Sequence, residues 1–128
     1  MATKVDTPLA PRAIGPYSQA VKANGFVFVS GQLPVDPKTG ELVQGGIGPM
    51  TERVIDNLEA ILQAAGTSLD KVVSCQVFLK DLKQDFMPMN EVYLKRFTSD
   101  CPPARFTVEV SNLPLNVPIE IACVATLP

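Results

Sequence analysis

Residues 17–30 read Tyr17-Ser18-Gln19-Ala20-Val21-Lys22-Ala23-Asn24-Gly25-Phe26-Val27-Phe28-Val29-Ser30. Two short runs of strand-forming residues, 17–22 and 26–30, stand on either side of the pair Asn24-Gly25. Both of these residue types tolerate the positive φ of a type I′ turn, so the pair is the strongest short-range hairpin signal a sequence offers. The stretch therefore predicts two antiparallel strands, and the rest of the sheet is placed relative to this hairpin.

The residues that follow the hairpin predict a third strand and a first helix. The run 36–40, Asp-Pro-Lys-Thr-Gly, is a turn leading into a brief strand around Leu42-Val43. The helix is expected from about Pro49 to Ala65, because proline suits a first turn and Gly66 suits the position just after a helix. Its apolar residues recur at steps of three and four and form one stripe: Met50, Val54, Leu58, Ile61, Leu62 and Ala65.

The second half of the chain predicts a strand, a helix and two further strands. The strand spans 72–80, with Val73, Cys75, Val77 and Leu79 expected on one face. The second helix is expected over 86–97, with Asp85 as its N-cap and Pro88 in its first turn. Its apolar stripe consists of Phe86, Met89, Tyr93 and Phe97. The last two strands are expected within 102–110 and 117–127.

One arginine stands at the start of the strand in residues 102–110. Alternation puts Phe106, Val108 and Val110 on one face, which we interpret as core, and places Arg105 on the other face with Thr107 and Glu109. A guanidinium held there presents a planar set of donors to a carboxylate or a phosphate. An exposed arginine with no role beyond the strand end remains the alternative.

The order of elements is three strands, helix, strand, helix, two strands. That order predicts an α+β fold, a mixed sheet with both helices packed on one face. No internal repeat or linker interrupts the 128 residues, so we expect residues 1–128 to form a single domain. The opposite face of the sheet needs a cover, for which sister subunits are the natural candidates.

Composition narrows the chemistry. With 11 Lys and Arg against 13 Asp and Glu, a net charge of −2 and no basic cluster, a nucleic acid is disfavoured as a partner. The absence of histidine removes the Ser-His-Asp and Cys-His arrangements and the commonest metal ligand. The three cysteines lack metal-ligand spacing, so we expect them reduced and packed, and we expect no metal and no cofactor. No apolar run is long enough for a membrane and no targeting segment opens the chain, so a cytoplasmic protein is expected.

Many short motifs, in order along nearly the whole chain, resemble those of the reactive-intermediate deaminases (the Rid family) of the YjgF type. They are Ala10-Pro11, residues 14–20 (Ile-Gly-Pro-Tyr-Ser-Gln-Ala), residues 29–34 (Val-Ser-Gly-Gln-Leu-Pro), Asp36-Pro37, Thr39-Gly40, Asn57-Leu58, Ala64-Ala65-Gly66, residues 77–82, Asp85-Phe86, residues 89–93, Pro103-Ala104-Arg105, Val108-Glu109-Val110, Leu113-Pro114 and Ile119-Glu120-Ile121. The resemblance implies a homotrimer with a chorismate-mutase-like fold and three clefts between subunits. It also implies a cofactor-free hydrolase of the 2-iminobutanoate/2-iminopropanoate deaminase type, which converts 2-imino and 2-enamino acids such as 2-aminoacrylate to 2-keto acids.

The resemblance also implies a set of site residues. Arg105 would hold the substrate carboxylate and Glu120 would position the attacking water. Tyr17, Ser30, Gly31 and Asn90 would line the cleft. Thr107 stands where many relatives carry cysteine, and its backbone amide is the expected substrate contact.

Other interpretations of the chain and of these residues remain open. The same clefts would serve a ligand-binding or chaperone-like trimer, and some relatives are described as ribonucleases or translation inhibitors, which the acidic balance and missing histidine make physically awkward. Glu120 would be a structural partner of Arg105 or of a lysine in the simpler alternative. Tyr17, Ser30 and Asn90 would then be packing or interface groups.

Overall fold

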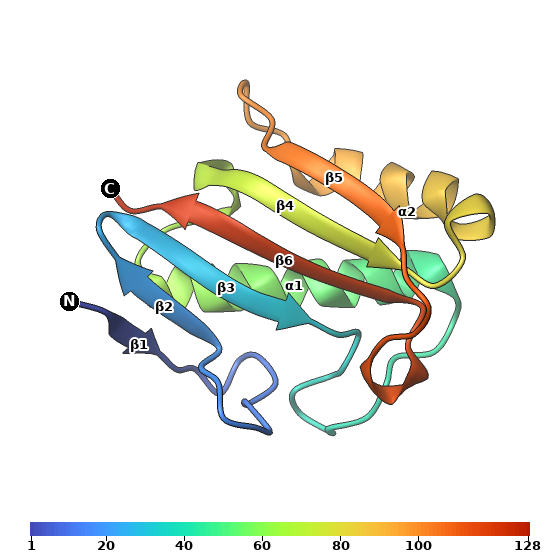
Figure 1. Ribbon diagram of the computed structural model, residues 1–128, viewed down its shortest axis with the longest axis horizontal. Helices are drawn as coiled ribbons and strands as arrows, with labels where there is room; N and C mark the ends of the chain where they lie inside the picture. The colour runs from blue at the N-terminus through green and yellow to red at the C-terminus, as the bar shows by residue number, and fades with distance from the viewer.

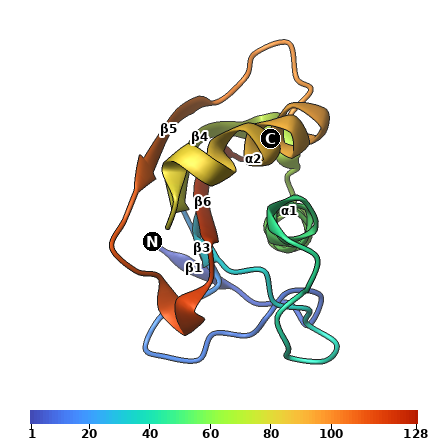
Figure 2. The same ribbon diagram turned by 90° about the vertical axis from the view of Figure 1, so that its right-hand side faces the viewer.

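The computed structural model describes residues 1–128 and contains one mixed sheet with two long helices. The elements are β1 (Thr3–Val5), β2 (Ala20–Ala23), β3 (Phe26–Gln32), α1 (Ile47–Ala65), η1 (Leu69–Lys71), β4 (Val72–Leu79), α2 (Leu82–Arg96), β5 (Ala104–Glu109), η2 (Pro114–Asn116) and β6 (Ile119–Thr126). The strand order is β1-β2-β3-β6-β4-β5, and only the β4–β5 pair is parallel (Figure 1). Both helices cover the same face of the sheet (Figure 2), as an α+β fold predicts.

The predicted hairpin is confirmed, but the third strand is not where we expected it. Asn24 and Gly25 have φ values of 51° and 82°, and β2 pairs with β3 in register on either side of them. The first strand of the hairpin begins only at Ala20. The expected strand at Leu42-Val43 is wrong: Leu42 forms a single isolated bridge to Val35, because the 36–40 turn folds the chain back on itself away from any free sheet edge. The strand missing from the prediction is β1, which pairs with β2.

The apolar stripe of α1 forms the centre of the core. Val54, Leu58, Ile61 and Leu62 are completely buried against the inner faces of β3 and β6. The helix ends at Gly66, whose φ of 93° is the left-handed conformation that glycine adopts without strain. The predicted buried face of this helix is therefore confirmed.

The start of α2 differs from the prediction by one turn. The N-cap is Asp81, whose Oδ1 accepts a hydrogen bond from the backbone N–H of Gln84 at 3.0 Å, so Asp85 as N-cap is wrong. Asp85 instead lies buried inside the helix. Pro88 consequently lies in the helix interior and not in the first turn, where the missing proline N–H leaves the Gln84 carbonyl without its usual helical partner.

Two predicted strand faces are corrected by the sheet. In β4 a bulge between Val72 and Ser74 inserts one residue, so Val72 is buried and Val73 is exposed, whereas Cys75, Val77 and Leu79 are buried as expected. In β5 the apolar residues Phe106 and Val108 are on the outer face of the sheet, away from the helices, and Arg105 faces inward. In β5, alternation identified which residues share a face, but it could not say which face the helices cover.

No helix of the structure has the length and apolar character needed to cross a membrane.

Candidate functional site

Arg105 lies on β5 next to β4, and its side chain contacts residues of α2. Arg105 is paired with Cys75 in the parallel β4–β5 register. Because paired residues share a face and Cys75 is buried under the helices, the Arg105 side chain also points toward the helices. Nη1 donates a hydrogen bond to Oδ1 of Asn90 at 2.8 Å. The guanidinium carbon stands 4.5 Å from the ring centroid of Tyr93 and 5.8 Å from that of Phe86. The guanidinium is therefore fixed by one amide oxygen and by aromatic faces.

No carboxylate of the chain pairs with Arg105. All three ion pairs of the structure are made by Arg96 with acids of α1, at 2.7 to 3.3 Å. Arg105 is half-buried, and only one of its five N–H groups has an acceptor in the chain. A half-buried cation without a counter-charge favours an anionic ligand, since a carboxylate would both neutralise it and accept its free donors.

Thr107 completes the group around Arg105. It lies two residues further along the same strand face, and its hydroxyl is buried without a hydrogen-bond partner. Asn90, Arg105 and Thr107, three of the predicted site residues, are therefore brought together. The sequence prediction assigned Phe86 and Tyr93 to the core stripe only; their spacings of four and three from Asn90 put all three on one helix face and would have revealed the contact.

The groups beneath Arg105 are held in neutral form. Burial raises the pKa of the Cys75 thiol, and burial together with the neighbouring Cys75 raises the pKa of the Tyr93 hydroxyl above its ordinary range. Cys75 and Cys123 are free, buried and directly opposite each other on β4 and β6, as packing cysteines are, whereas Cys101 is exposed. Of the ionisable groups Arg105, Cys75 and Tyr93, which lie together on this face of the sheet, Arg105 is therefore the one that carries a charge.

Ser30, Gly31 and Glu120 form a second group on the outer face of the sheet. The register of β3 against β6 shifts between Val29 and Gln32, which places Ser30 and Gly31 in a bulge. The Ser30 hydroxyl donates to the Ser18 carbonyl oxygen at 2.6 Å. A Cβ atom at Gly31 would collide with Oε2 of Glu120, so only glycine lets the carboxylate lie directly against this strand.

Glu120 makes no ion pair and no hydrogen bond within the chain. The alternative that it serves as a structural partner of Arg105 or of a lysine is therefore wrong for a single chain. Partial burial raises the pKa of its carboxyl above the ordinary glutamate value. A carboxyl with a raised pKa and no partner is suited to exchanging a proton with a bound water or substrate.

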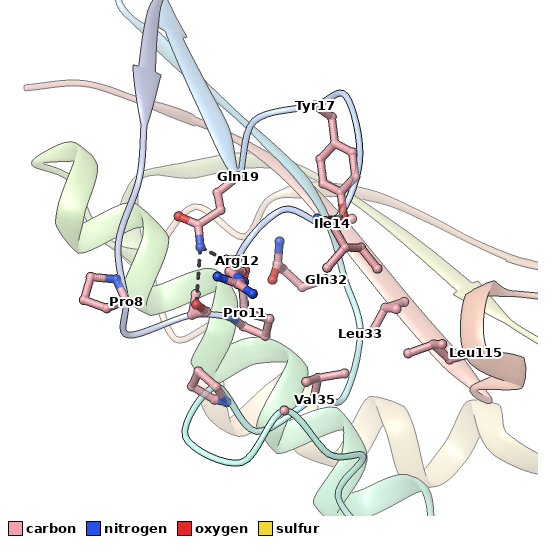
Figure 3. A pocket seen from close by; sticks show the side chains of 14 residues that line it. Pro8, Pro11, Arg12, Ile14, Tyr17, Gln19, Gln32, Leu33, Val35 and Leu115 are labelled. Carbon is pink, nitrogen blue, oxygen red and sulfur yellow. Dashed lines mark hydrogen bonds between the residues drawn. The ribbon is translucent and has the colours of Figure 1, made fainter.

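A pocket of about 430 Å³ opens beside Gly31 at the end of the sheet (Figure 3). Its wall is mostly apolar and consists of Pro8, Ala10, Pro11, Arg12, Ile14, Tyr17, Gln19, Gly31, Gln32, Leu33, Val35, Pro37, Gly40 and Leu115. Tyr17 lines it, half exposed, with its hydroxyl oxygen 3.5 Å from the backbone N–H of Ile14. Tyr17 and Gly31, both predicted site residues, therefore line the same pocket, and Gly31 also lies directly against Glu120.

Gln19 organises the wall of this pocket, a role that the sequence prediction missed. Its side chain is buried, its Oε1 accepts from the Thr7 N–H at 2.7 Å, and Nε2 donates to the Thr7 carbonyl oxygen at 3.0 Å. Nε2 also donates to the carbonyl oxygens of Ala10 and Pro11 at 3.3 and 2.9 Å (Figure 3). These bonds hold the 7–11 loop against β2. The sequence signal was a glutamine that follows a proline-rich stretch. Its amide must find hydrogen-bond partners wherever the fold buries it, because buried polar groups are almost always hydrogen-bonded.

The two groups lie on opposite faces of the sheet and do not meet in one chain. Arg105 is level with Cys75 on β4, whereas Glu120 is level with Phe78. With strands about 4.8 Å apart and a rise of about 3.3 Å per residue, their Cα atoms are about 14 Å apart, and their side chains point away from each other. One copy of the chain thus carries two separate groups of predicted site residues. We call them the Arg105 half-site (Asn90, Arg105, Thr107) and the Glu120 half-site (Tyr17, Ser30, Gly31, Glu120).

The structure contains no group of three or more Cys, Asp or Glu side chains that could hold a metal ion.

The fold and the two half-sites define a class of small α+β proteins with an unpaired arginine at a sheet edge and a glutamate beside a strand glycine. A family model described as Endoribonuclease L-PSP matches residues 7–127, so the chain belongs to this family, the YjgF/Rid family. The chain is 52% identical over 125 residues to a RutC family protein of Pyrococcus horikoshii, covering 98% of each chain. It is 48% identical to Reactive Intermediate Deaminase A, chloroplastic, of Arabidopsis thaliana, covering 96% of this chain and 65% of the relative. Its structure matches that of E. coli TdcF with bound serine at a TM-score of 0.91 and 37% identity, over 98% of this chain and 99% of the other.

Proposed function

We propose that the protein is a hydrolytic deaminase that converts reactive 2-imino and 2-enamino acids, such as 2-aminoacrylate, to 2-keto acids and ammonia. The observation that carries the proposal is Arg105, a half-buried cation with no counter-charge in its own chain and with free donors. Membership of a family with a relative named Reactive Intermediate Deaminase supports it, as does a related structure that holds serine, an amino acid with the same carboxylate.

We further propose that the protein acts as a homotrimer whose clefts join the Arg105 half-site of one subunit to the Glu120 half-site of the next. A three- or four-carbon imino acid is only about 5 Å long at bond lengths of about 1.5 Å, so it cannot reach both half-sites of one chain. The outer face of the sheet supports an assembly: Phe26, Phe28, Phe106 and Val108 are 38% to 50% exposed there, and apolar side chains exposed together on one face mark interaction surfaces. Light scattering should give a mass near three times 13.8 kDa; a monomer would contradict the joined cleft.

The proposed reaction needs an anchored carboxylate, an aligned water and a path for protons. Arg105 would hold the carboxylate of the substrate through paired N–H groups, with Thr107 alongside. Glu120 would accept a proton from water as the water oxygen adds to C2, and would return it to the nitrogen. The hydroxyl proton of the resulting carbinolamine then passes to the nitrogen through Glu120, the C–N bond breaks, ammonia leaves and the C2 carbonyl remains. An enamine such as 2-aminoacrylate enters this path after it gains a proton at C3 and loses one from nitrogen, which turns it into the imine. Because the imine carbon is already electrophilic, orientation and proton transfer suffice without a covalent nucleophile.

A coupled assay tests the proposal. A serine dehydratase generates 2-aminoacrylate, and the release of pyruvate is followed at early times with and without the protein. The deaminase should speed pyruvate release in proportion to its concentration, and the Arg105→Ala variant should not. Equal early rates with and without the protein would contradict the deaminase activity and favour a ligand-binding or chaperone-like trimer.

The family description raises endoribonuclease activity as a second candidate. The chain has no histidine and a net charge of −2, so neither the usual general base for RNA cleavage nor a basic surface for phosphates is present. Incubation with a labelled single-stranded RNA, at the protein concentration of the deaminase assay, tests this candidate directly. Cleavage that persists in Arg105→Ala would have to arise elsewhere on the molecule.

We retain a single functional domain over residues 1–128 and a cytoplasmic location as parts of the proposal. The three free thiols support a reducing compartment. The chloroplastic relative from Arabidopsis thaliana shows that members of the family also work in an organelle, so localisation of a tagged full-length chain is the direct test.

A further inference from the structure

We propose that Tyr93 is a positioning residue that acts through Arg105: its ring holds the guanidinium in the plane in which it grips the substrate carboxylate. The inference rests on the proposed role of Arg105 as the carboxylate anchor. It concerns how that anchor is kept in the orientation that binds the carboxylate, and it goes from the contact between Tyr93 and Arg105 to an effect on ligand binding.

The first argument is the contact geometry. The guanidinium carbon of Arg105 is 4.5 Å from the Tyr93 ring centroid, within cation–π range, and the ring belongs to the same helix face as Asn90, which takes one N–H of the guanidinium. Phe86, one turn before Asn90 and two turns before Tyr93 on α2, has its ring centroid 5.8 Å from the guanidinium carbon. An amide oxygen at one nitrogen and a ring against the cation restrict two different motions, translation along the strand and rotation of the guanidinium plane.

The second argument is that the Tyr93 ring itself cannot move. It is buried and stacks on Phe97 with a centroid distance of 4.4 Å and an interplanar angle of 25°. Met89, one turn earlier, is completely buried in the same core. A fixed ring limits the rotamers of an arginine side chain that would otherwise lose much conformational freedom on binding a ligand.

The third argument is that the hydroxyl of Tyr93 does not contribute to this role. It is buried beside the Cys75 thiol, and it makes no hydrogen bond to Arg105 or Asn90. The ring, and not the hydroxyl, therefore accounts for the contact with Arg105. This distinction gives a conservative variant, Tyr93→Phe, that should preserve the function of the parent.

The test is a double-mutant cycle of Tyr93→Leu with Arg105→Lys, measured by deamination of 2-aminoacrylate and by calorimetric titration with pyruvate. We expect Tyr93→Leu to lower kcat/KM and pyruvate affinity by about tenfold in the parent background. In the Arg105→Lys background the same change should cost less than about twofold, because a residue that acts through Arg105 has little left to position. Tyr93→Phe should stay within about twofold of the parent in both assays.

Phe97→Leu is the matched control for lost packing. It removes a ring of the same aromatic stack at the end of α2, but the aromatic rings that face the Arg105 guanidinium are those of Tyr93 and Phe86. It should lower the melting temperature, as Tyr93→Leu does, while changing pyruvate affinity far less. If Tyr93→Leu does not fold, Tyr93→Met replaces it, since methionine fills the space with a flexible chain and no ring.

Three results separate this inference from the deaminase proposal. Equal losses from Tyr93→Leu in both backgrounds, or a loss in Tyr93→Phe as large as in Tyr93→Leu, would overturn the positioning role. A parent protein that binds pyruvate through a coupled Tyr93 and Arg105 but does not speed 2-aminoacrylate hydrolysis would support the positioning role and refute the deaminase. A parent that hydrolyses the substrate with no coupling between the two residues would do the reverse.

Discussion

Replacing Arg105 by lysine keeps the positive charge and removes the fork of donors. In the structure one guanidinium N–H is used by Asn90 and the ring of Tyr93 faces the cation, so the remaining N–H groups are those available to a substrate carboxylate. A lysine ammonium that keeps the Asn90 bond would offer a single well-aligned donor to the carboxylate, and its point charge would not fix the carboxylate plane. The change therefore costs one charge-assisted hydrogen bond, about 1.5 to 3 kcal/mol.

Since about 1.4 kcal/mol corresponds to a factor of ten, Arg105→Lys should lower kcat/KM by about tenfold to a hundredfold, and Arg105→Ala should lower it further. The coupled 2-aminoacrylate assay measures the loss, with light scattering and circular dichroism as checks that assembly and fold are unchanged. Parent-like activity in a correctly assembled Arg105→Lys protein would refute the carboxylate clamp and move the ligand-binding interpretation ahead.

Three further predictions concern Glu120, the core and the helix surface. Glu120→Gln should lower kcat by about tenfold or more, because an amide holds water but cannot take its proton, with a smaller effect on pyruvate affinity. Because burial raises the pKa of the folded-state carboxyl, the ionised group opposes folding above that pKa. The variant should therefore melt higher than the parent at pH 7, and this gain should vanish as the pH falls and the parent carboxyl is protonated; a variant that melts lower than the parent at pH 7 would contradict the assignment. Leu58→Ala, at a completely buried position, should cost about 2 to 5 kcal/mol in urea unfolding, and an unchanged midpoint would mean that the buried face is misassigned. Arg96→Met removes three ion pairs to α1 and should cost about 1 to 2 kcal/mol, less in 1 M salt; a loss that salt leaves unchanged would show that packing and not charge is responsible.

Local features of the fold could be predicted because nearby residues determine them. The hairpin follows from the backbone freedom of Asn24 and Gly25, and the buried face of α1 follows from the spacing of apolar residues such as Leu58. Features that depend on partners distant in the chain were missed. Alternation predicts that Val73 lies on the same face of β4 as Cys75, but a bulge against β6 turns the Val73 side chain outward.

The candidate site shows the same division. The identities of Arg105 and Glu120 were available from the motifs of the sequence, but their relation was not. Their separation onto opposite faces depends on β6 lying between β3 and β4, and on the parallel pairing of β5 with β4. The face of β5 was misjudged for a related reason: Phe106 and Val108 are apolar although no part of their own chain covers them, so hydrophobicity alone could not identify the inner face.

The position of β6 also has a consequence for how the protein is made. The last strand of the chain, Ile119–Thr126, is hydrogen-bonded between β3 and β4 in the interior of the sheet. Until those residues have left the ribosome, the β1-β2-β3 part and the β4-β5 part have no strand to join them, and the inner edges of β3 and β4 remain unpaired. Folding of the whole sheet must therefore await the synthesis of β6. Such long-range pairing slows folding and leaves strand edges exposed to other chains in the meantime. Deleting residues 119–128 would remove the centre of the sheet, a far greater loss than the deletion of an edge strand.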